Sequence, residues 1–234
     1  MKAAIVESLS GVTLVGGGPV PAALMRRVLA LAPVLVAADG GADRALALGQ
    51  VPQAVIGDLD SLSEAARARL PATAVHRIAE QDTTDFDKAL RHIAAPFVLG
   101  LGFAGARVDH TLAVFNTLAR HPQRRCLILS ATDVCFLAPA TLCLRLPPGS
   151  RLSLYPLGPV RGESTGLRWP IDGLGFAPDG VIGTSNEVSA PEVRLAFDAP
   201  RMLVILPRAA LRPALAALVP AWRPGGAPSA ARGG

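Results

Sequence analysis

Carboxylates gather in one part of this 234-residue chain, and they are the residues best suited to do chemistry. Eight of the 12 aspartates fall between residues 39 and 109. Carboxylates that converge repel one another and raise one another's pKa unless a cation lies among them. Oxygen ligands of this kind suit Mg²⁺. The eight are Asp39, Asp43, Asp58, Asp60, Asp82, Asp85, Asp87 and Asp109.

Most of these aspartates fall at the ends of expected strands or the starts of expected helices. From residue 12 to about 130, short runs rich in β-branched residues or leucine alternate with helical patterns, which predicts a mostly parallel α/β sheet. The carboxyl ends of such strands share one edge, where these folds bind ligands. The expected strands are 12–17, 34–39, 53–58, 74–79, 97–101 and 126–130, and the expected helices are 20–31, 42–48, 61–70, 84–94 and 108–120.

After residue 130 the pattern changes to strand-like runs separated by proline and glycine, namely VCFLA, TLCLRL, RLSLYPL, EVRLAF and MLVILP. This pattern is typical of a small β-sandwich or barrel. We therefore expect an α/β fold in which an N-terminal, mostly parallel α/β sheet domain (1–130) precedes a smaller C-terminal all-β sandwich domain (131–207). Residues 208–234 are expected to begin as a short helix and to end, over 224–234, as a disordered tail.

The composition excludes several classes of protein. With 50% hydrophobic and 18% charged residues the chain is globular. Its net charge of +5 is too mild to make nucleic acid the expected partner. No apolar run has a membrane span's length of about 18 residues, and no signal peptide is recognisable, so we expect a soluble, cytoplasmic protein without a membrane partner. The three cysteines lack CxxC spacing, which favours buried, reduced thiols.

The segment IGDLDS (56–61) follows an apolar strand with carboxylates at Asp58 and Asp60. In an extended strand, residues two apart point to the same face, so this pair could hold one cation or position two. The structural alternative is a solvated turn in which Asp60 or Ser61 caps the next helix. The motif alone leaves both interpretations open.

The segment QDTTDFDKAL (81–90) places acids around the start of a helix. With Thr84 as the cap, Asp87 three residues later is explained by a capping box, so a structural role is favoured for Asp87. Capping does not require the two further acids around this turn, Asp82 and Asp85, so a functional role is favoured for both.

Two glycine-containing segments follow expected strands. In AADGGADRAL (37–46), Asp39 ends a strand and the glycines either let a ligand approach or merely form a tight turn, which is the favoured interpretation. VGGGPV (15–20) lacks the third glycine of a dinucleotide-binding fingerprint and is a weaker case. Asp43 is given no catalytic role.

The segment GFAGARVDHTLAVFNTLAR (102–120) runs from a strand through two glycines into a strongly periodic helix. Free N–H groups at the helix start, together with Arg107, would suit a phosphate oxygen. A functional role is favoured for Arg107 and Asp109, whereas His110 is interpreted as an ordinary helix-start residue.

Taken in order, DGGAD, GDLDS, QDTTDFDKAL and GxxGxRxDH, followed by GLRWP (166–170) and GTSNE (183–187), resemble the thiamine pyrophosphokinases. The resemblance covers about residues 34–206. It implies a homodimer with an N-terminal α/β domain and a C-terminal β-sandwich. It also implies transfer of the terminal pyrophosphate of ATP to the hydroxyl group of thiamine, which leaves AMP.

The resemblance also implies roles for single residues. Asp58, Asp60 and Asp85 would be the catalytic carboxylates that hold Mg²⁺, with Gln81 and Asp82 beside them. ATP would be surrounded by Asp39, Gly40, Thr84, Lys88, Arg107 and Asp109. Trp169 would offer its face to the thiamine ring, and Ser185 and Asn186 would complete that pocket, across the dimer interface. The alternatives are another Mg²⁺-dependent phosphotransferase or phosphohydrolase, and a non-catalytic module that binds a nucleotide or thiamine.

Overall fold

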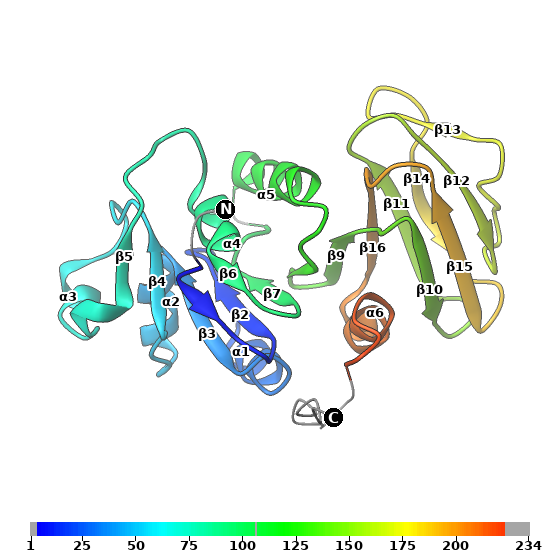
Figure 1. Cartoon of the computed structure of the whole chain (residues 1–234). Helices are drawn as coiled ribbons and strands as arrows, with labels where there is room; N and C mark the ends of the chain where they lie inside the picture. The colour runs from blue at the N-terminus through cyan, green and yellow to red at the C-terminus, as the bar shows by residue number, and fades with distance from the viewer. Residues whose placement is uncertain (1–3, 106, 223–234) are drawn as a thin grey trace, which may run out of the picture. The chain divides into compact units, whose positions relative to one another are not determined.

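The computed structural model describes residues 4–105 and 107–222, which form two compact units (Figure 1). The first unit extends to Val114 and includes Trp222, and the second runs from Phe115 to Ala221. The domain boundaries expected at residues 130 and 207 stay predictions. The tail expected to be disordered, 224–234, lies outside the described residues.

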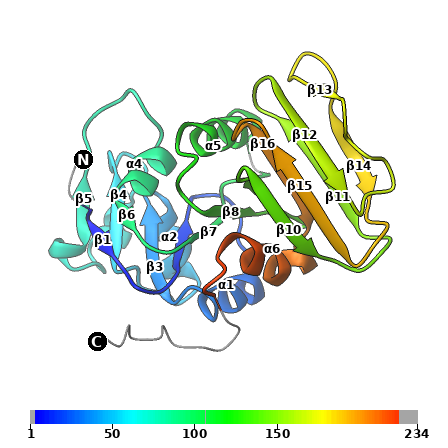
Figure 2. The same ribbon diagram turned by 45° about the vertical axis from the view of Figure 1, so that its right-hand side comes forward.

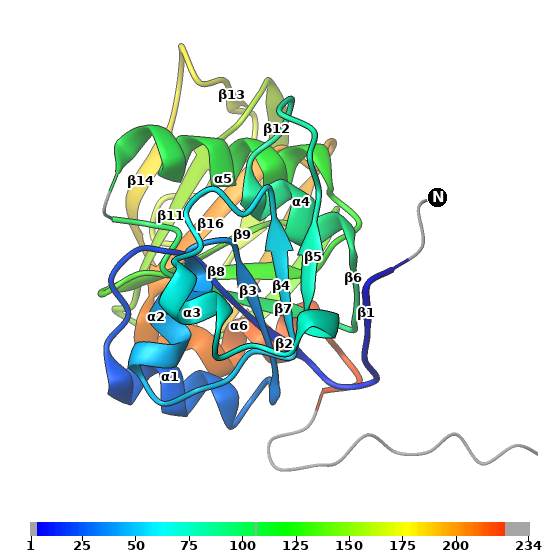
Figure 3. The ribbon, with the colours of Figure 1, turned by 90° about the vertical axis from the view of Figure 1, so that its left-hand side faces the viewer.

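The first unit contains a sheet of five parallel strands, three of which lie side by side in Figure 3 as β3, β4 and β5. Three of the five, β2, β4 and β7, are buried along their whole length, as in parallel sheets covered on both faces. Their carboxyl ends therefore meet at one edge. In sheet order the strands are β7 (Val98–Leu101), β2 (Val12–Val15), β3 (Val34–Ala38), β4 (Ala54–Gly57) and β5 (Val75–Arg77).

All five predicted helices of the first half are present, and four of them are shorter than or offset from the predicted range. Helix α4 begins at the predicted cap, since the hydroxyl of Thr84 accepts the N–H of Asp87 at 3.4 Å. Helix α3 is capped by Ser63 rather than by Asp60 or Ser61. The helices are α1 (Ala22–Leu29), α2 (Gly41–Ala47), α3 (Glu64–Arg67), α4 (Asp85–Arg91) and α5 (Val108–Arg120), with a 3₁₀ turn at Ala72–Ala74.

The sequence did not predict one short parallel pair of strands, β1 (Val6–Glu7) and β6 (Ile93–Ala94). The N–H groups of Ile5 and Val6 both donate to the carbonyl of His92. The helical pattern that predicts a helix to residue 94 is therefore wrong after Arg91, because the chain there pairs with the N-terminal segment instead.

Gly41 shows why the turn after β3 needs a glycine. A Cβ atom at this position would lie 2.0 Å from the backbone oxygen of Val15, which belongs to β2. No side chain fits so close to a strand, so helix α2 can pack there only through a glycine. The structural interpretation of this turn is therefore confirmed for Gly41.

The second unit contains two sets of antiparallel strands, of which β10, β15 and β12 are seen side by side in Figure 2. Burial alternates along β10 and β15, so one face of their sheet packs inward. The first set is β14 (Gly183–Glu187), β11 (Arg151–Pro156), β16 (Met202–Pro207), β9 (Asp133–Leu137) and β8 (Cys126–Leu129), and the second is β10 (Thr141–Arg145), β15 (Glu192–Phe197), β12 (Val160–Thr165) and β13 (Gly175–Phe176).

The five predicted strands of this half are confirmed, and so is the short helix, α6 (Leu211–Leu218), which follows a 3₁₀ turn at Arg208–Ala210. Strands β12, β13 and β14 were not predicted because their sequences are short or polar and show no apolar alternation. The mixed α/β class is thus confirmed, with parallel strands in the first unit and antiparallel strands in the second.

Two further expectations concern the membrane and the cysteines. Within 4–105 and 107–222, no helix has the length and apolar character needed to cross a membrane.

All three cysteines are free; Cys126 and Cys135 are buried as expected, whereas Cys143 on β10 is exposed. The expectation of a buried thiol is therefore wrong at Cys143.

Candidate functional site

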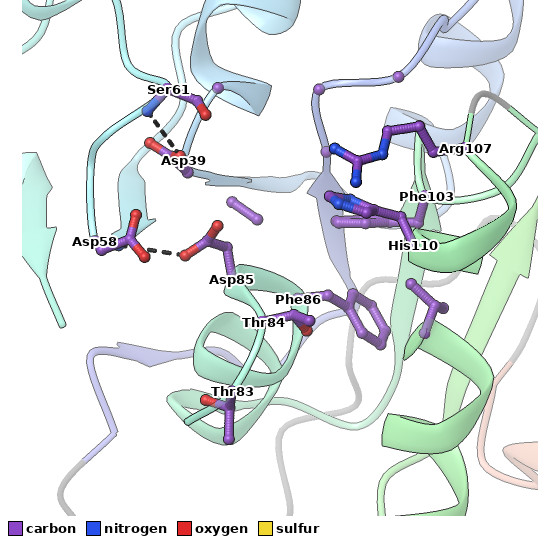
Figure 4. Close-up of a pocket in the computed structure, with 17 residues that line it drawn as sticks. Asp39, Asp58, Ser61, Thr83, Thr84, Asp85, Phe86, Phe103, Arg107 and His110 are labelled. Carbon is purple, nitrogen blue, oxygen red and sulfur yellow. Dashed lines mark hydrogen bonds between the residues drawn. The ribbon is translucent and has the colours of Figure 1, made fainter. Parts of the chain in front are cut away.

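A cavity of about 450 Å³ lies at the carboxyl ends of the parallel strands in the first unit (Figure 4). The segments that follow β2, β3, β4 and β7 line it, together with the starts of α4 and α5. This is the edge where the pattern of aspartates predicts a ligand site. The cavity has an acidic side, formed by aspartates, and an aromatic side, formed by Phe86, Phe103 and His110.

The acidic side brings together Asp39, Asp58 and Asp60, each of which offers one carboxylate oxygen within 4.8 Å of the others. Asp39 is 3% exposed. Its Oδ2 atom accepts the N–H of Ser61 at 3.0 Å, while its buried Oδ1 atom has no hydrogen-bond partner among the described residues. Hard oxygen donors and a buried, unused acceptor are a chemical fit for a divalent cation such as Mg²⁺.

The pKa of Asp39 is raised to about 6, and burial is the largest cause. The N–H of Ser61 acts in the opposite direction, whereas the charge of Asp85 and the nearby carboxyl group of Asp60 act in the same direction as burial. A cation held at this carboxylate would favour its ionised form.

Lys88 lies buried beneath the carboxylates, with its side chain 1% exposed. Its Nζ atom is 2.8 Å from Oδ2 of Asp58 and 3.2 Å from Oδ1 of Asp85, and the latter oxygen also accepts the N–H of Asp58 at 3.2 Å. The hydrogen bond from Lys88 holds the pKa of Asp58 below its usual value. Although burial alone lowers the pKa of Lys88, its bonds to the two carboxylates raise it above its usual value, so Lys88 stays charged.

The segment before α4 is held by an ion-pair network that sequence reasoning missed. Oε1 of Glu80 lies 2.6 Å from Nη2 of Arg91, and Oε2 of Glu80 accepts the N–H groups of Asp82 and Thr83 at 2.9 and 3.1 Å. Arg91 also reaches the buried carboxylate of Asp87, with Nε 2.8 Å from Oδ1. The ion pair with Arg91 supports a structural role for Asp87, in addition to the contact of its N–H with the hydroxyl group of Thr84. The missed signal is that Arg91 lies four residues after Asp87 on one helix face.

Glu80→Gln tests this network through its pH dependence. The hydroxyl of Thr83, with Arg91 and the N–H of Asp82, lowers the pKa of Glu80 from 4.5 to about 2. Because the folded pKa is the lower one, the carboxylate stabilises the protein fully above pH 4.5, and this stabilisation is lost as the pH falls toward 2. We expect Glu80→Gln to lower the free energy of unfolding by about 1–2 kcal/mol at pH 7.

Urea denaturation at pH 7 and pH 3 checks this expectation, with Glu64→Gln, an exposed acid on α3, as the charge-matched control. The difference between Glu80→Gln and wild type should shrink by more than half at pH 3, and Glu64→Gln should match wild type at both. A deficit of the same size at both pH values would contradict the assigned role of Glu80.

The aromatic side of the cavity was not predicted. The rings of Phe86 and Phe103 are 4.7 Å apart and inclined by 58°, and His110 lines the same cavity (Figure 4). The glycines after β2 also line the cavity: a Cβ atom at Gly16 would lie 2.6 Å from the ring of Phe103, and one at Gly18 would lie 2.6 Å from the oxygen of Gly102. Interpreting His110 as an ordinary helix-start residue overlooked its place in the cavity wall.

Arg107 and Asp109 form an exposed pair at the start of α5. The guanidinium group of Arg107 donates to both oxygens of Asp109, at 3.1 and 2.6 Å, and lowers the pKa of Asp109 to about 2. Arg107 lines the cavity, where a guanidinium group is suited to binding an anion, although in this structure it is paired with Asp109.

The other residues that the resemblance places near ATP occupy different positions. Gly40 and Thr84 line the cavity. Gln81 lies beside the carboxylates, since its amide donates to Oδ2 of Asp58 at 3.4 Å. Asp82 is exposed and contacts Glu80 through its own N–H group.

The three residues expected to bind the thiamine ring lie together in the second unit. The side-chain amide of Asn186 donates to the carbonyl of Trp169 at 2.7 Å and accepts its N–H at 3.3 Å. Trp169 is 52% exposed, and the guanidinium group of Arg168 lies 4.8 Å from the centre of its ring. Ser185 has a φ angle of 60° and donates its N–H to the hydroxyl of Ser153 at 2.9 Å. An indole face that already accepts a cation can accept a cationic ligand.

Two family models match the chain. Residues 25–129, which include the acidic side of the cavity, match the model described as "Thiamin pyrophosphokinase, catalytic domain". Residues 143–202, which include Trp169, Ser185 and Asn186, match the model described as "Thiamin pyrophosphokinase, vitamin B1 binding domain".

Individual proteins that resemble the chain are also named thiamine pyrophosphokinases. The chain is 31% identical over 191 residues to thiamine pyrophosphokinase 3 of Oryza sativa subsp. japonica, a match that covers 67% of this chain and 72% of the relative. It is 29% identical over 216 residues to thiamine pyrophosphokinase 1 of the same plant, covering 75% and 82%. The solved thiamin pyrophosphokinase of Candida albicans is 15% identical, with a TM-score of 0.71 over 88% of this chain and 95% of that one, which shows a shared fold.

Proposed function

The chain belongs to the thiamine pyrophosphokinase family, and from that premise we propose how its residues carry out the reaction. It is an ATP-dependent thiamine diphosphokinase, which transfers the pyrophosphate of ATP to the hydroxyl group of thiamine and releases AMP. The two alternatives left open by the motifs are not favoured by these matches. The observation that carries the assignment of the site is the group of carboxylates at the strand edge, inside the segment that matches the catalytic model.

The reaction sets the chemical task of the cavity. The thiamine oxygen forms a bond to the β-phosphorus of ATP while the bond between that phosphorus and the bridging oxygen to the α-phosphorus breaks, which leaves AMP. Little covalent chemistry falls to the protein, so catalysis rests on positioning and on stabilising the negative charge of the phosphates. We assign Arg107 to the phosphate oxygens, because its guanidinium group lines the cavity opposite the carboxylates (Figure 4).

The carboxylates that would hold Mg²⁺ are Asp58, Asp60 and Asp85. The ion would supply positive charge that neutralises the β- and γ-phosphate oxygens. Lys88 pairs with both Asp58 and Asp85 and so fixes their orientation, and its hydrogen bond lowers the pKa of Asp58. Asp60 and Asp85 are the candidates for accepting the proton of the thiamine hydroxyl group.

We assign the ring of thiamine to Trp169, with Ser185 and Asn186 beside it. Thiamine is cationic and planar, and an indole face attracts such a ring. In this proposal the enzyme is a cytoplasmic homodimer whose second copy completes the pocket, and each copy consists of an α/β domain followed by a β-sandwich.

Trp169→Ala is expected to raise the KM for thiamine about tenfold and to leave the KM for ATP within about twofold, since a lost cation–π contact costs about 1–2 kcal/mol. Steady-state kinetics with each substrate varied in turn measure both constants. Trp169→Phe keeps a ring face and should recover most of the affinity for thiamine. An unchanged KM for thiamine in Trp169→Ala would remove Trp169 from the site.

The reaction itself is tested by incubating the full chain with ATP, Mg²⁺ and thiamine, omitting each component in turn, and separating nucleotides and thiamine esters by chromatography. We expect AMP and thiamine diphosphate in equal amounts, and neither when a component is missing. Production of ADP or inorganic phosphate in place of AMP would overturn the proposal.

A further inference from the structure

The unpartnered oxygen of Asp39 is the feature of the cavity that the assignments above leave unexplained. Oδ1 is buried and lacks a hydrogen-bond partner among the described residues, although Asp39, which is 3% exposed, lines the cavity. Buried acceptors are almost always satisfied, so an orphaned one points to a missing ligand. Figure 4 shows Asp39 between Ser61 and Asp58, on the acidic side of the cavity.

The arrangement of the neighbouring carboxylates favours a cation as that ligand. One oxygen from each of Asp39, Asp58 and Asp60 lies within 4.8 Å of the others. An Mg²⁺–oxygen distance is about 2.1 Å, so opposite ligands of one ion are about 4.2 Å apart. The three oxygens therefore lie close to the separation that a single ion requires.

The positive charge of Lys88 is paired with other carboxylates than that of Asp39. Its ammonium group forms ion pairs with Asp58 and Asp85, at 2.8 and 3.2 Å. Asp39 is instead held by backbone contacts: Ser61 donates to its Oδ2, and its own N–H donates to the carbonyl of Ile56 at 3.1 Å. These contacts fix the carboxylate while its second oxygen stays available.

We propose that Asp39 is a direct ligand of the divalent cation in this cavity, beside Asp58 and Asp60 of the set assigned above. The third member of that set, Asp85, pairs with Lys88 and is not part of this group of three oxygens. The family resemblance places Asp39 near ATP without assigning it to the metal. The inference rests on the proposed function only for the location of the site, because the geometry predicts cation binding by the protein without nucleotide.

The test is binding of Mn²⁺, a spectroscopic substitute for Mg²⁺, to the full chain without nucleotide. Electron paramagnetic resonance measures free Mn²⁺ during the titration of wild type, Asp39→Asn and Glu64→Gln. Asn keeps the size of Asp, tolerates the φ angle of 44° at this position and can still accept the N–H of Ser61. Glu64→Gln removes one negative charge outside the cavity and controls for net charge.

We expect Asp39→Asn to weaken Mn²⁺ binding at least tenfold and Glu64→Gln to bind within twofold of wild type. Mn²⁺ should raise the melting temperature of wild type more than that of Asp39→Asn, while in EDTA Asp39→Asn should melt at or above the wild-type temperature because it lacks a buried charge. If Asp39→Asn shows no melting transition in EDTA, Asp39→Ser replaces it.

Two results would overturn the inference: Mn²⁺ binding by Asp39→Asn within twofold of Glu64→Gln, or no Mn²⁺ binding by wild type. Thiamine-dependent formation of AMP by the same wild-type preparation is scored separately. An active enzyme with Asp39-independent Mn²⁺ binding rejects the inference alone, and Asp39-dependent binding without turnover rejects the proposed function alone.

Discussion

Asp58→Asn is expected to lower kcat about a thousandfold while the chain stays folded. Asp58 follows β4 on the acidic side of the cavity: one of its oxygens lies within 4.8 Å of oxygens of Asp39 and Asp60, and its Oδ2 atom pairs with Lys88 at 2.8 Å. Asn keeps the shape but removes the charge that would hold the cation. Loss of one preorganised electrostatic group in an active site costs about 10²–10³ in kcat, and Asp58 serves two such contacts.

Steady-state kinetics and circular dichroism check this result, with Asp43→Asn as the matched control. Asp43 lies on α2 in the same unit, and its carboxylate accepts the N–H of Ser63 at 3.1 Å at the start of α3. Asp43→Asn should retain activity within about twofold. A folded Asp58→Asn enzyme with near-normal turnover would contradict the placing of Asp58 in the catalytic site.

Lys88→Met is expected to lower the free energy of unfolding by about 3 kcal/mol at pH 7. Removing the ammonium group leaves two partly buried carboxylates, Asp58 and Asp85, without their shared counter-ion, and breaking a buried ion pair from one side costs about 3–5 kcal/mol. We place the loss at the lower limit because the Asp85 side chain is 31% exposed.

Urea denaturation of a double-mutant cycle measures this effect. Adding Asp85→Asn to Lys88→Met should recover part of the lost stability, because one of the two repelling charges is removed. A Lys88→Met protein within 1 kcal/mol of wild type, or a double variant less stable than the sum of the single losses, would contradict the buried counter-ion role of Lys88.

The acidic edge of the sheet could be predicted because it depends on local signals. Each apolar strand is short and ends at a carboxylate or a glycine, so the positions of Asp39 and Asp58 at neighbouring strand ends follow from the alternation of strands and helices. The parallel order then places both at one edge. The helix start at Asp85 follows from Thr84, an ordinary cap residue.

Contacts between distant segments could not be predicted in the same way. Glu80 and Arg91 look like ordinary surface charges until the loop before α4 folds back over that helix. The aromatic pair of Phe86 and Phe103 joins α4 to the segment after β7, and no periodicity links the two. Strand β14 carries GTSNE, whose residues are mostly polar although they pair with β11, so it lacks the apolar pattern that identifies a strand.

The role expected for Lys88 shows the limit of motif reading. The motif places a lysine three residues after Asp85, which suits a phosphate contact as well as an ion pair along the helix. In the folded chain the side chain is buried and its ammonium group faces Asp58 and Asp85. Burial, which the motif does not report, favours the ion pair.

The central claim, that this chain transfers pyrophosphate from ATP to thiamine, is tested most directly by following the β-phosphorus. ATP labelled at that position is incubated with the full chain, Mg²⁺ and thiamine, and the products are separated by chromatography. We predict that the label appears in thiamine diphosphate at the rate at which unlabelled AMP forms. Label recovered in ADP or inorganic phosphate, with no labelled thiamine ester, would contradict the claim.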